Sequence, residues 1–132
     1  MCVLVVEDEW LIRSLLVEIL SEHGFEVSEA SSADEAVDLV RRANDGKSRF
    51  SLLVSDINLP GGQDGFGVAA AFRRNYPGAP IVFVTGRPHT IGDFPERLPS
   101  DILLMKPFRP SQLLKIVTSL IGRPEADPLA RH

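Results

Sequence analysis

Ser51-Leu-Leu-Val-Ser-Asp56 is a short apolar run that ends in one acid and passes into the turn-forming segment Ile57-Asn-Leu-Pro-Gly-Gly62. An apolar run of this length between turn signals is typical of a strand buried on both faces. Asp56 then stands at the carboxyl end of the strand, the edge where open parallel sheets bind their ligands. Taken alone, Asp56 is better explained as a turn residue or a helix cap. Its partners elsewhere in the chain therefore decide its role.

The composition is that of a single globular domain with an acidic balance. The chain has 132 residues, of which 44% are hydrophobic, and a net charge of −4. These values fit one core and exclude the basic surface that nucleic-acid binding requires. No apolar run approaches the roughly 20 residues of a membrane span, and no signal peptide precedes Val3. The single cysteine, Cys2, cannot form an internal disulfide. We therefore expect a cytoplasmic protein that binds neither nucleic acid nor membrane.

Strand and helix patterns alternate along the chain. Apolar runs predict strands at 2–6, 51–56, 79–84 and 102–105, and an alternating pattern predicts an edge strand at 25–29. Helical patterns, with a capping box from Ser32 to Glu35, predict helices at 10–22, 32–43, 64–75 and 110–121. The alternation predicts an α/β fold, a flavodoxin-like doubly wound (βα)5 sandwich with parallel strand order 2-1-3-4-5. We expect the domain to span 1–122, a loose tail at 123–132, and solvated helix ends at Arg41-Arg42 and Arg73-Arg74.

The segment between the fourth and fifth predicted strands fits this alternation poorly. Pro88, Pro95 and Pro99 fall where a crossover helix belongs, and proline in a helix interior costs about 3 kcal/mol. We expect a short, irregular or mobile fourth helix here, with one or two turns around 91–97.

Polar side chains follow the carboxyl ends of four predicted strands. Glu7 and Asp8 follow the first strand, Asp56 ends the third, and two further groups follow the last two strands, Thr85 and Lys106. In the order 2-1-3-4-5 the first and third strands are neighbours, so their three carboxylates are expected to meet. Carboxylates at such short distances repel one another unless a cation lies among them. A site made only of oxygen ligands suits Mg²⁺.

This set of residues has a chemical use. A carboxylate such as Asp56 can attack phosphorus to form an acyl phosphate, while a lysine and Mg²⁺ stabilise the transferring oxygens and a hydroxyl binds the product. Each piece also has an ordinary explanation: acids suit a helix start, Thr-Gly is a common turn, and Lys-Pro often leads into a helix. The coincidence of all four at strand ends favours the functional interpretation.

At this point the chain resembles the receiver domain of bacterial two-component response regulators. The resemblance rests on Val3-Leu-Val-Val-Glu-Asp-Glu9, Ser55-Asp-Ile-Asn-Leu-Pro60 with Asp64-Gly65, Val84-Thr-Gly86 and Lys106-Pro-Phe108. It implies that Asp56 accepts phosphate from a sensor histidine kinase or a histidine phosphotransfer protein. It also implies that Thr85 and Lys106 engage the phosphoryl oxygens. The implied Mg²⁺ ligands are Glu7, Asp8, Asp56 and the backbone carbonyl of Asn58. Phe83-Val-Thr-Gly86 is similar to a single-domain, mostly alphaproteobacterial subgroup with a Phe-x-Thr-Gly signature.

Two features depart from the family's pattern. Leu103 stands where receivers usually carry the aromatic half of their switch, and the fourth crossover is rich in proline. We therefore hypothesise that Thr85 acts on a loop or frayed helix rather than on an aromatic rotamer. There is also one residue more than usual between Asp56 and Gly65, which Gly61-Gly62 is expected to absorb.

The first predicted helix is apolar over an unusually wide arc. Between residues 10 and 20 only three are polar, and the apolar side chains cover about 180° of arc, more than a core-facing stripe needs. Either neighbouring helices cover both flanks or one flank is exposed for a partner. Receivers generally meet their kinases through this helix and the loop after the fifth strand, which makes Ile12, Leu15, Pro107 and Phe108 the candidate kinase contacts.

The function we expect is that of a stand-alone phosphoacceptor whose output is a partner interaction or a phosphate sink. It phosphorylates and dephosphorylates itself, and is not expected to be an enzyme with an external substrate. The main alternative is a phosphorylation-independent protein-binding module on the same fold. An Asp-nucleophile phosphohydrolase would need an acid where Asn58 stands. An FMN binder would need a glycine- and hydroxyl-rich loop in place of the acids after the first strand.

Overall fold

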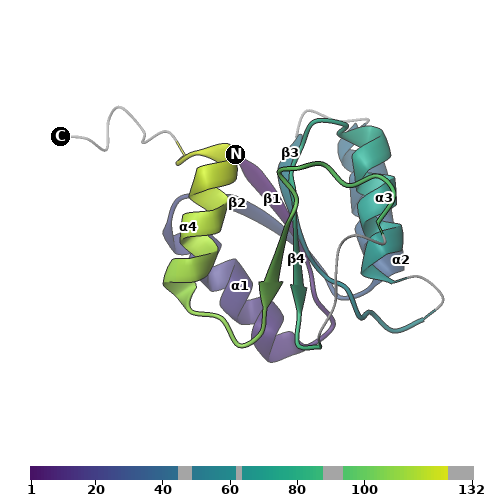
Figure 1. Ribbon diagram of the computed structural model, residues 1–132. Helices are drawn as coiled ribbons and strands as arrows, with labels where there is room; N and C mark the ends of the chain where they lie inside the picture. Colours follow the sequence, from purple (N-terminus) through teal and green to yellow (C-terminus); the bar gives the residue numbers. More distant parts are fainter. Residues whose placement is uncertain (45–48, 62–63, 88–93, 125–132) are drawn as a thin grey trace.

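The chain folds into a five-stranded parallel sheet with helices on both sides (Figure 1). The computed structural model describes residues 1–44, 49–61, 64–87 and 94–124. The elements in order are β1 (Cys2–Val6), α1 (Trp10–Glu22), β2 (Glu26–Ala30), α2 (Ala33–Asn44), β3 (Phe50–Asp56), α3 (Gly65–Asn75), β4 (Ile81–Thr85), β5 (Ile102–Met105) and α4 (Pro110–Ile121). The strand order is β2-β1-β3-β4-β5, which confirms the predicted flavodoxin-like fold. Among the described residues, no helix combines the length and the apolar character that a bilayer crossing requires.

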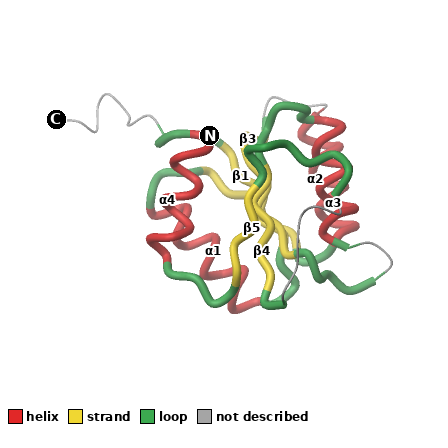
Figure 2. The backbone as a smooth tube through the Cα atoms, in the orientation of Figure 1, coloured by secondary structure: helices red, strands yellow, loops and turns green. Residues whose placement is uncertain are grey.

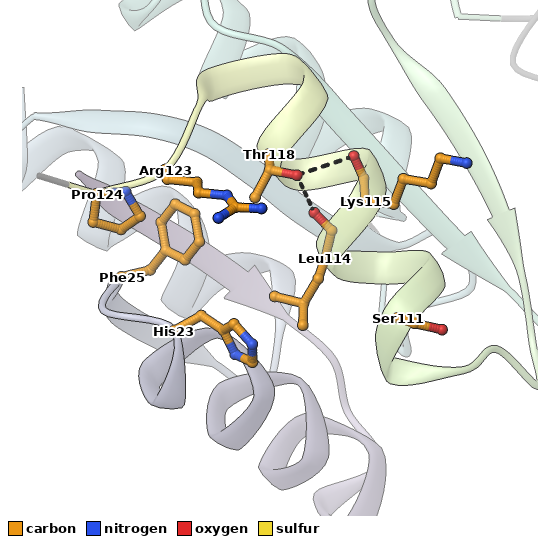
Figure 3. A pocket seen from close by; sticks show the side chains of 8 residues that line it. All are labelled: His23, Phe25, Ser111, Leu114, Lys115, Thr118, Arg123 and Pro124. Atoms are coloured by element: carbon orange, nitrogen blue, oxygen red, sulfur yellow. Dashed lines mark hydrogen bonds between the residues drawn. The ribbon is translucent and has the colours of Figure 1, made fainter.

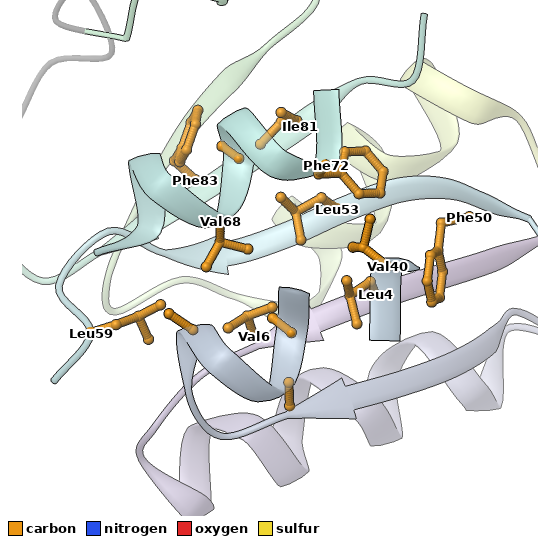
Figure 4. Close-up of a cluster of buried hydrophobic side chains, with 14 of the residues drawn as sticks. Leu4, Val6, Val40, Phe50, Leu53, Leu59, Val68, Phe72, Ile81 and Phe83 are labelled. Carbon is orange, nitrogen blue, oxygen red and sulfur yellow. The ribbon is translucent and has the colours of Figure 1, made fainter. Parts of the chain in front are cut away.

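Two helix layers sandwich the sheet, with α1 and α4 on one side and α2 and α3 on the other (Figure 2). Successive side chains of a strand point to opposite faces, so each buried strand serves both layers. In β1, Val3 and Val5 pack toward α1 and α4, whereas Leu4 and Val6 join the cluster beneath α2 and α3 (Figure 4). This double burial explains why the strands appear in the sequence as nearly continuous apolar runs.

Local signals set the helix ends. The Ser32 hydroxyl accepts a hydrogen bond from the Glu35 backbone N–H (3.2 Å), as a helix cap should. The Glu35 carboxylate, however, accepts from the N–H and hydroxyl of Ser31 rather than from Ser32, so the predicted capping box is confirmed only in its first half. At the start of α3 the Asp64 carboxylate accepts from the Gly67 N–H (3.1 Å).

The described part of the connection between β4 and β5 contains no helix. One turn closes between the carbonyl of Phe94 and the N–H of Arg97 (3.2 Å), and a second between the carbonyl of Leu98 and the N–H of Asp101 (3.0 Å). Phe94 is buried and stacks on Phe66 of α3, with ring centroids 5.9 Å apart, and meets Phe83 of β4 edge-on at 5.5 Å. Residues 88–93 lie outside the described residues, so the predicted turns around 91–97 are tested only from residue 94 onward.

Arg73 corrects one expectation. Its neighbour Arg74 is exposed as expected, but Arg73 is buried and its Nη2 lies 2.7 Å from Asp101 Oδ1. Its Nη1 donates to the carbonyl of Glu96 (2.6 Å) and its Nη2 also to that of Ala79 (3.0 Å). The guanidinium is drawn inward because Asp101 offers it a buried carboxylate and because the backbone before β4 and before β5 offers it two carbonyls.

Asp101 completes this buried network from the other side. Its Oδ1 accepts from the backbone N–H of Ile81 (3.0 Å) and its Oδ2 from that of Leu98 (2.7 Å). The carboxylate therefore joins the start of β4 to the residues that lead into β5. Through Arg73, α3 is tied to the same point, which fixes the described part of the connection, where no helix forms.

Candidate acidic site at the carboxyl edge of the sheet

Four strand ends meet at one edge of the sheet. Asp56 ends β3 and pairs in register with Val84 of β4. Backbone hydrogen bonds continue past the strands, from the Ile57 N–H to the Val84 carbonyl (3.2 Å) and from the Lys106 N–H to the Thr85 carbonyl (2.7 Å). Because the strands are parallel, the residues that follow each of them lie side by side.

Three carboxylates gather at this edge. Glu7, Asp8 and Asp56 each have a carboxylate oxygen within 4.8 Å of the others. Glu7 and Asp56 are buried, whereas Asp8 is exposed. A set of hard oxygen donors, one side of which faces water, fits Mg²⁺, which prefers a few carboxylates and keeps several of its waters. The Asn58 backbone carbonyl as a further ligand stays a prediction.

Lys106 neutralises the two buried acids. Its Nζ lies 3.0 Å from Glu7 Oε2 and 3.1 Å from Asp56 Oδ2. Burial by itself lowers the pKa of the Lys106 ammonium, but the hydrogen bond and charge of Glu7, with those of Asp56, outweigh it and hold that pKa above its usual value. The lysine is therefore charged and placed directly beside the Asp56 carboxylate.

Glu7 is the carboxyl of the group whose pKa is raised most clearly. Burial raises the pKa of its carboxyl to about 7, and the nearby charge of Asp56 acts in the same direction, while the Lys106 hydrogen bond opposes both. Its Oε1 accepts from the Glu9 backbone N–H (3.2 Å), and its own carbonyl accepts from Arg13 Nη1 (2.9 Å). These contacts fix Glu7 in place although its negative charge is costly there.

Thr85 is joined to the Asp56 loop through Asn58. The Asn58 side-chain amide donates to Thr85 Oγ1 (3.1 Å), while the Asn58 backbone N–H donates to Asp56 Oδ1 (3.0 Å). Thr85 Oγ1 also accepts from the Arg87 N–H (3.2 Å) and is within 3.3 Å of the Arg87 carbonyl, to which it donates. The sequence indicated Thr85 and the Asn58 carbonyl but gave no signal for the role of the Asn58 side chain.

Gly65 allows α3 to begin directly against the strand end. A Cβ atom at this position would collide with the Asp56 carbonyl oxygen and lie 2.7 Å from the Ile57 Cα. The Gly65 N–H donates to the Ile57 carbonyl (2.8 Å). The segment between them contains Gly61 at φ +95°, while Gly62 lies outside the described residues, so how the extra residue is absorbed is tested only in part.

A cavity of about 400 Å³ opens at this edge beside Asp56. It is lined by Asp8, Glu9, Asp56, Asn58, Gly86, Arg87 and Lys106. Glu9, Gly86 and Arg87 were not predicted as lining residues. Glu9 is the third acid of the run after β1, and Gly86 and Arg87 follow Thr85 directly, so their positions next to predicted site residues were the available signal.

The predicted partner face is exposed in part. Leu15 is 42% exposed and Pro107 is exposed, whereas Ile12 and Phe108 are half-buried against the core. Trp10 and Leu11, which were not among the candidates, are 66% and 74% exposed. The start of α1 and the loop before α4 lie toward the same edge of the molecule in Figure 1. One flank of α1 is therefore exposed to solvent, which agrees with the alternative in which neighbouring helices do not cover both flanks.

Leu103, which replaces the usual aromatic residue, is half-buried and packs against the cluster beneath α2 and α3. It pairs in register with Phe83 of β4. The hypothesis that Thr85 acts on the following loop concerns a segment of which residues 88–93 lie outside the described ones, and it stays a hypothesis.

Fold and site together define a doubly wound α/β domain with an acidic cluster and a lysine at its switch point. The family model of the response regulator receiver domain matches residues 3–118, and the chain belongs to this family. The subgroup with the Phe-x-Thr-Gly signature stays a prediction.

Individual proteins agree with this assignment. The chain is 30% identical over 129 residues to the transcriptional regulatory protein SrrA of Staphylococcus aureus, covering 94% of this chain and 49% of that protein. The chain thus spans about half the length of the curated relative it matches. A response regulator receiver protein from Sinorhizobium medicae has a similar structure, with 27% identity, a TM-score of 0.80 and coverage of 92% and 94% of the two chains. The response regulator TrrA of Thermotoga maritima, solved in complex with Mg(2+)-BeF, is 30% identical with a TM-score of 0.74 and coverage of 90% and 97%.

Proposed function

We propose that this receiver domain accepts a phosphoryl group on Asp56 from a sensor histidine kinase or a histidine phosphotransfer protein, with Mg²⁺ at the acidic cluster. The observation that carries the proposal is the position of Lys106 Nζ, 3.1 Å from Asp56 Oδ2 within a group of three carboxylates. The Mg(2+)-BeF complex of the relative TrrA supports it.

Asp56, Lys106 and Thr85 have different roles in the proposed phosphoryl transfer. A carboxylate oxygen of Asp56 forms a bond to phosphorus while the bond from phosphorus to the donor's imidazole nitrogen breaks, and that nitrogen keeps the electron pair. Lys106 then exchanges its contact with Asp56 for one with a phosphoryl oxygen, and the Thr85 hydroxyl donates to another. Mg²⁺, when bound, supplies positive charge against the developing negative charge of the phosphoryl oxygens.

Phosphotransfer is tested with a small phosphodonor. The full chain is incubated with acetyl phosphate and Mg²⁺, and its intact mass is measured over time. We expect a gain of one phosphoryl group that requires Mg²⁺ and is lost in Asp56→Asn. The matched control is Asp34→Asn, which changes an exposed aspartate of α2 and should phosphorylate normally. Phosphorylation of Asp56→Asn at the normal rate would place the acceptor elsewhere.

The kinase contact is proposed on the exposed flank of α1 and the loop before α4. The predicted contacts are Ile12, Leu15, Pro107 and Phe108, and the exposed side chains of Trp10 and Leu11 extend the same surface. Leu15→Ser removes an exposed apolar contact, so it should slow transfer from the cognate donor without changing phosphorylation by acetyl phosphate. If Leu15→Ser accepted phosphate from the cognate donor as fast as the unchanged chain does, this face would be excluded as the kinase contact.

A phosphorylation-independent binding module remains the second candidate. The observation that favours it is Leu103, a half-buried leucine where receivers usually carry the aromatic half of their switch. Its signature in the mass experiment is the absence of any phosphorylated species. We regard the protein as a phosphoacceptor with no external substrate. That it acts without an attached output domain stays a prediction, because the relative SrrA is about twice as long.

A further inference from the structure

A second cavity lies between the carboxyl-terminal end of α1 and the helix α4 (Figure 3). Its volume is about 620 Å³, larger than the cavity beside Asp56. The residues that give it its character are His23, Phe25, Leu114, Lys115, Arg123 and Pro124. They share no member with the acidic site or with the proposed kinase contacts, so the proposed phosphotransfer makes no use of this groove.

The lining is basic in an acidic protein. The exposed side chains of Lys115 and Arg123 and the imidazole of His23 contribute to it, and none of its lining residues is acidic. Within the described residues, neither Lys115 nor Arg123 forms an ion pair. Glu22 and Glu26 stand close to these residues in the sequence but do not line the groove. The chain as a whole carries a net charge of −4, so this is a local reversal of its charge.

The floor of the groove is apolar and its internal polar groups are already satisfied. Phe25 is buried, and Leu114 and Pro124 are half-buried. The Thr118 hydroxyl donates to the Leu114 carbonyl (2.7 Å), and His23 Nδ1 donates to the Ile19 carbonyl (3.0 Å). A ligand therefore meets an apolar base flanked by Lys115 and Arg123, which form no ion pair with any described residue.

We propose that this groove docks an acidic peptide segment of a partner protein, with an apolar side chain on the floor and carboxylates against Lys115 and Arg123. Charge complementarity selects an acidic ligand. The walls of the groove include the exposed residues His23, Lys115 and Arg123, which leave a ligand partly in solvent. This selects a peptide, because small-molecule sites enclose most of their ligand's surface. The partner can bind while the acidic edge is engaged elsewhere, since the two surfaces share no residue.

The test uses the full chain without Mg²⁺ or phosphodonor, so its result does not depend on the proposed phosphorylation. The probe is the fluorescein-labelled peptide Asp-Glu-Asp-Phe-Leu-Asp-Glu-Asp, and binding is followed by fluorescence anisotropy at low salt. We expect saturable binding that shifts the backbone amide resonances of His23 and Thr118. Replacing the acids of the peptide by glutamine, or its Phe-Leu pair by Ser-Ser, should weaken the binding.

Matched charge reversals locate the contact. Lys115→Glu with Arg123→Glu should weaken binding about tenfold, since each loses an ion pair and gains a repulsion. Arg49→Glu with Arg97→Glu changes the net charge equally at exposed positions outside the groove and should have little effect. The milder pair Lys115→Gln with Arg123→Gln serves if the first reversal does not fold.

Three results would overturn the proposal. The first is the absence of saturable binding. The second is that both double charge reversals weaken peptide binding equally, which would mean that binding depends on the net charge of the chain and not on the groove. The third is binding of octanoate, a small amphipathic anion, at the groove when the peptide does not bind, which would make it a small-molecule site.

Discussion

The side-chain amide of Asn58 donates a hydrogen bond to the Thr85 hydroxyl over 3.1 Å, joining two strand ends 27 residues apart in the sequence. The same hydroxyl is held by the backbone of Arg87 on both its donor and its acceptor side. Thr85 is therefore fully engaged in this state. To donate to a phosphoryl oxygen it must give up its bond to the Arg87 carbonyl, and any movement of the hydroxyl toward that oxygen stretches the bond it accepts from Asn58.

Asn58→Ala should release part of this restraint. We expect phosphorylation by acetyl phosphate to become about two- to tenfold faster, the range that corresponds to one net hydrogen bond. The time course of intact mass measures the rate. Thr118→Ala, which removes a hydroxyl bonded within α4, is the control. An unchanged or slower rate in Asn58→Ala would show that this hydrogen bond does not restrain Thr85.

Lys106→Met should destabilise the metal-free protein. It leaves the buried Glu7 and Asp56 without their shared cation, and losing one partner of a buried ion pair costs about 3 kcal/mol. Urea unfolding in the presence of a chelator measures the loss. Mg²⁺ should restore part of the stability because it supplies the missing positive charge. Lys115→Met, at an exposed lysine, should change the free energy of unfolding little.

The pKa of Glu7 predicts how metal-free stability depends on pH. The folded carboxyl has a pKa of about 7, above the ordinary value of 4.5, so the folded state binds its proton more tightly than the unfolded state. The resulting stabilisation is complete below pH 4.5 and is lost as the pH rises through about 7. Glu7→Gln should flatten this decline in urea unfolding between pH 5 and 8, whereas Glu18→Gln should not. A decline of the same slope in both variants would assign it to other groups.

Gly65→Ala should strain the segment that carries Asp56. The new Cβ collides with backbone atoms rather than with a flexible side chain, so α3 or the strand end must shift. We expect a loss of about 1–3 kcal/mol in the free energy of unfolding, together with slower phosphorylation by acetyl phosphate. Gly78→Ala is the control, since nothing lies within 4 Å of a Cβ atom there.

The Arg73–Asp101 pair can be measured by a double-mutant cycle. Either single change, Arg73→Leu or Asp101→Leu, strands a buried charge and should cost about 3–5 kcal/mol. The double variant should cost less than the sum of the two, and the difference is the coupling energy. Arg74→Leu, at the exposed neighbour, should be nearly neutral. Additive single effects would mean that the two side chains act independently.

The arrangement of the acidic edge could be predicted because it depends on topology alone. Because β1 and β3 are neighbouring parallel strands, the residues at their carboxyl ends must lie side by side. The carboxylate oxygens of Glu7, Asp8 and Asp56 accordingly lie within 4.8 Å of one another. Lys106 follows for the same reason, as the residue after the last strand. The helix bounds were predictable from caps such as Ser32 and Asp64, whose bonds are local in sequence.

The main misses depend on partners distant in sequence. Arg73 was expected in solvent because it ends a helix beside Arg74, and nothing local points to Asp101, 28 residues later. The bond from Asn58 to Thr85 likewise requires the pairing of β3 with β4 before it can be seen. Exposure of Leu11 and Leu15 could not be decided either, because it depends on where α4 packs, not on the periodicity of α1.

The alternation of β3 has an evolutionary consequence. Leu53 belongs to the packing beneath α2 and α3, while Leu52 and Val54 belong to the packing beneath α1 and α4. A substitution in one cluster therefore has no direct contact with the other cluster and acts on it only through the sheet. The α1–α4 flank can in this way accept side-chain changes at small cost to the opposite flank, whereas a change in the backbone of the strand that ends in Asp56 acts on both.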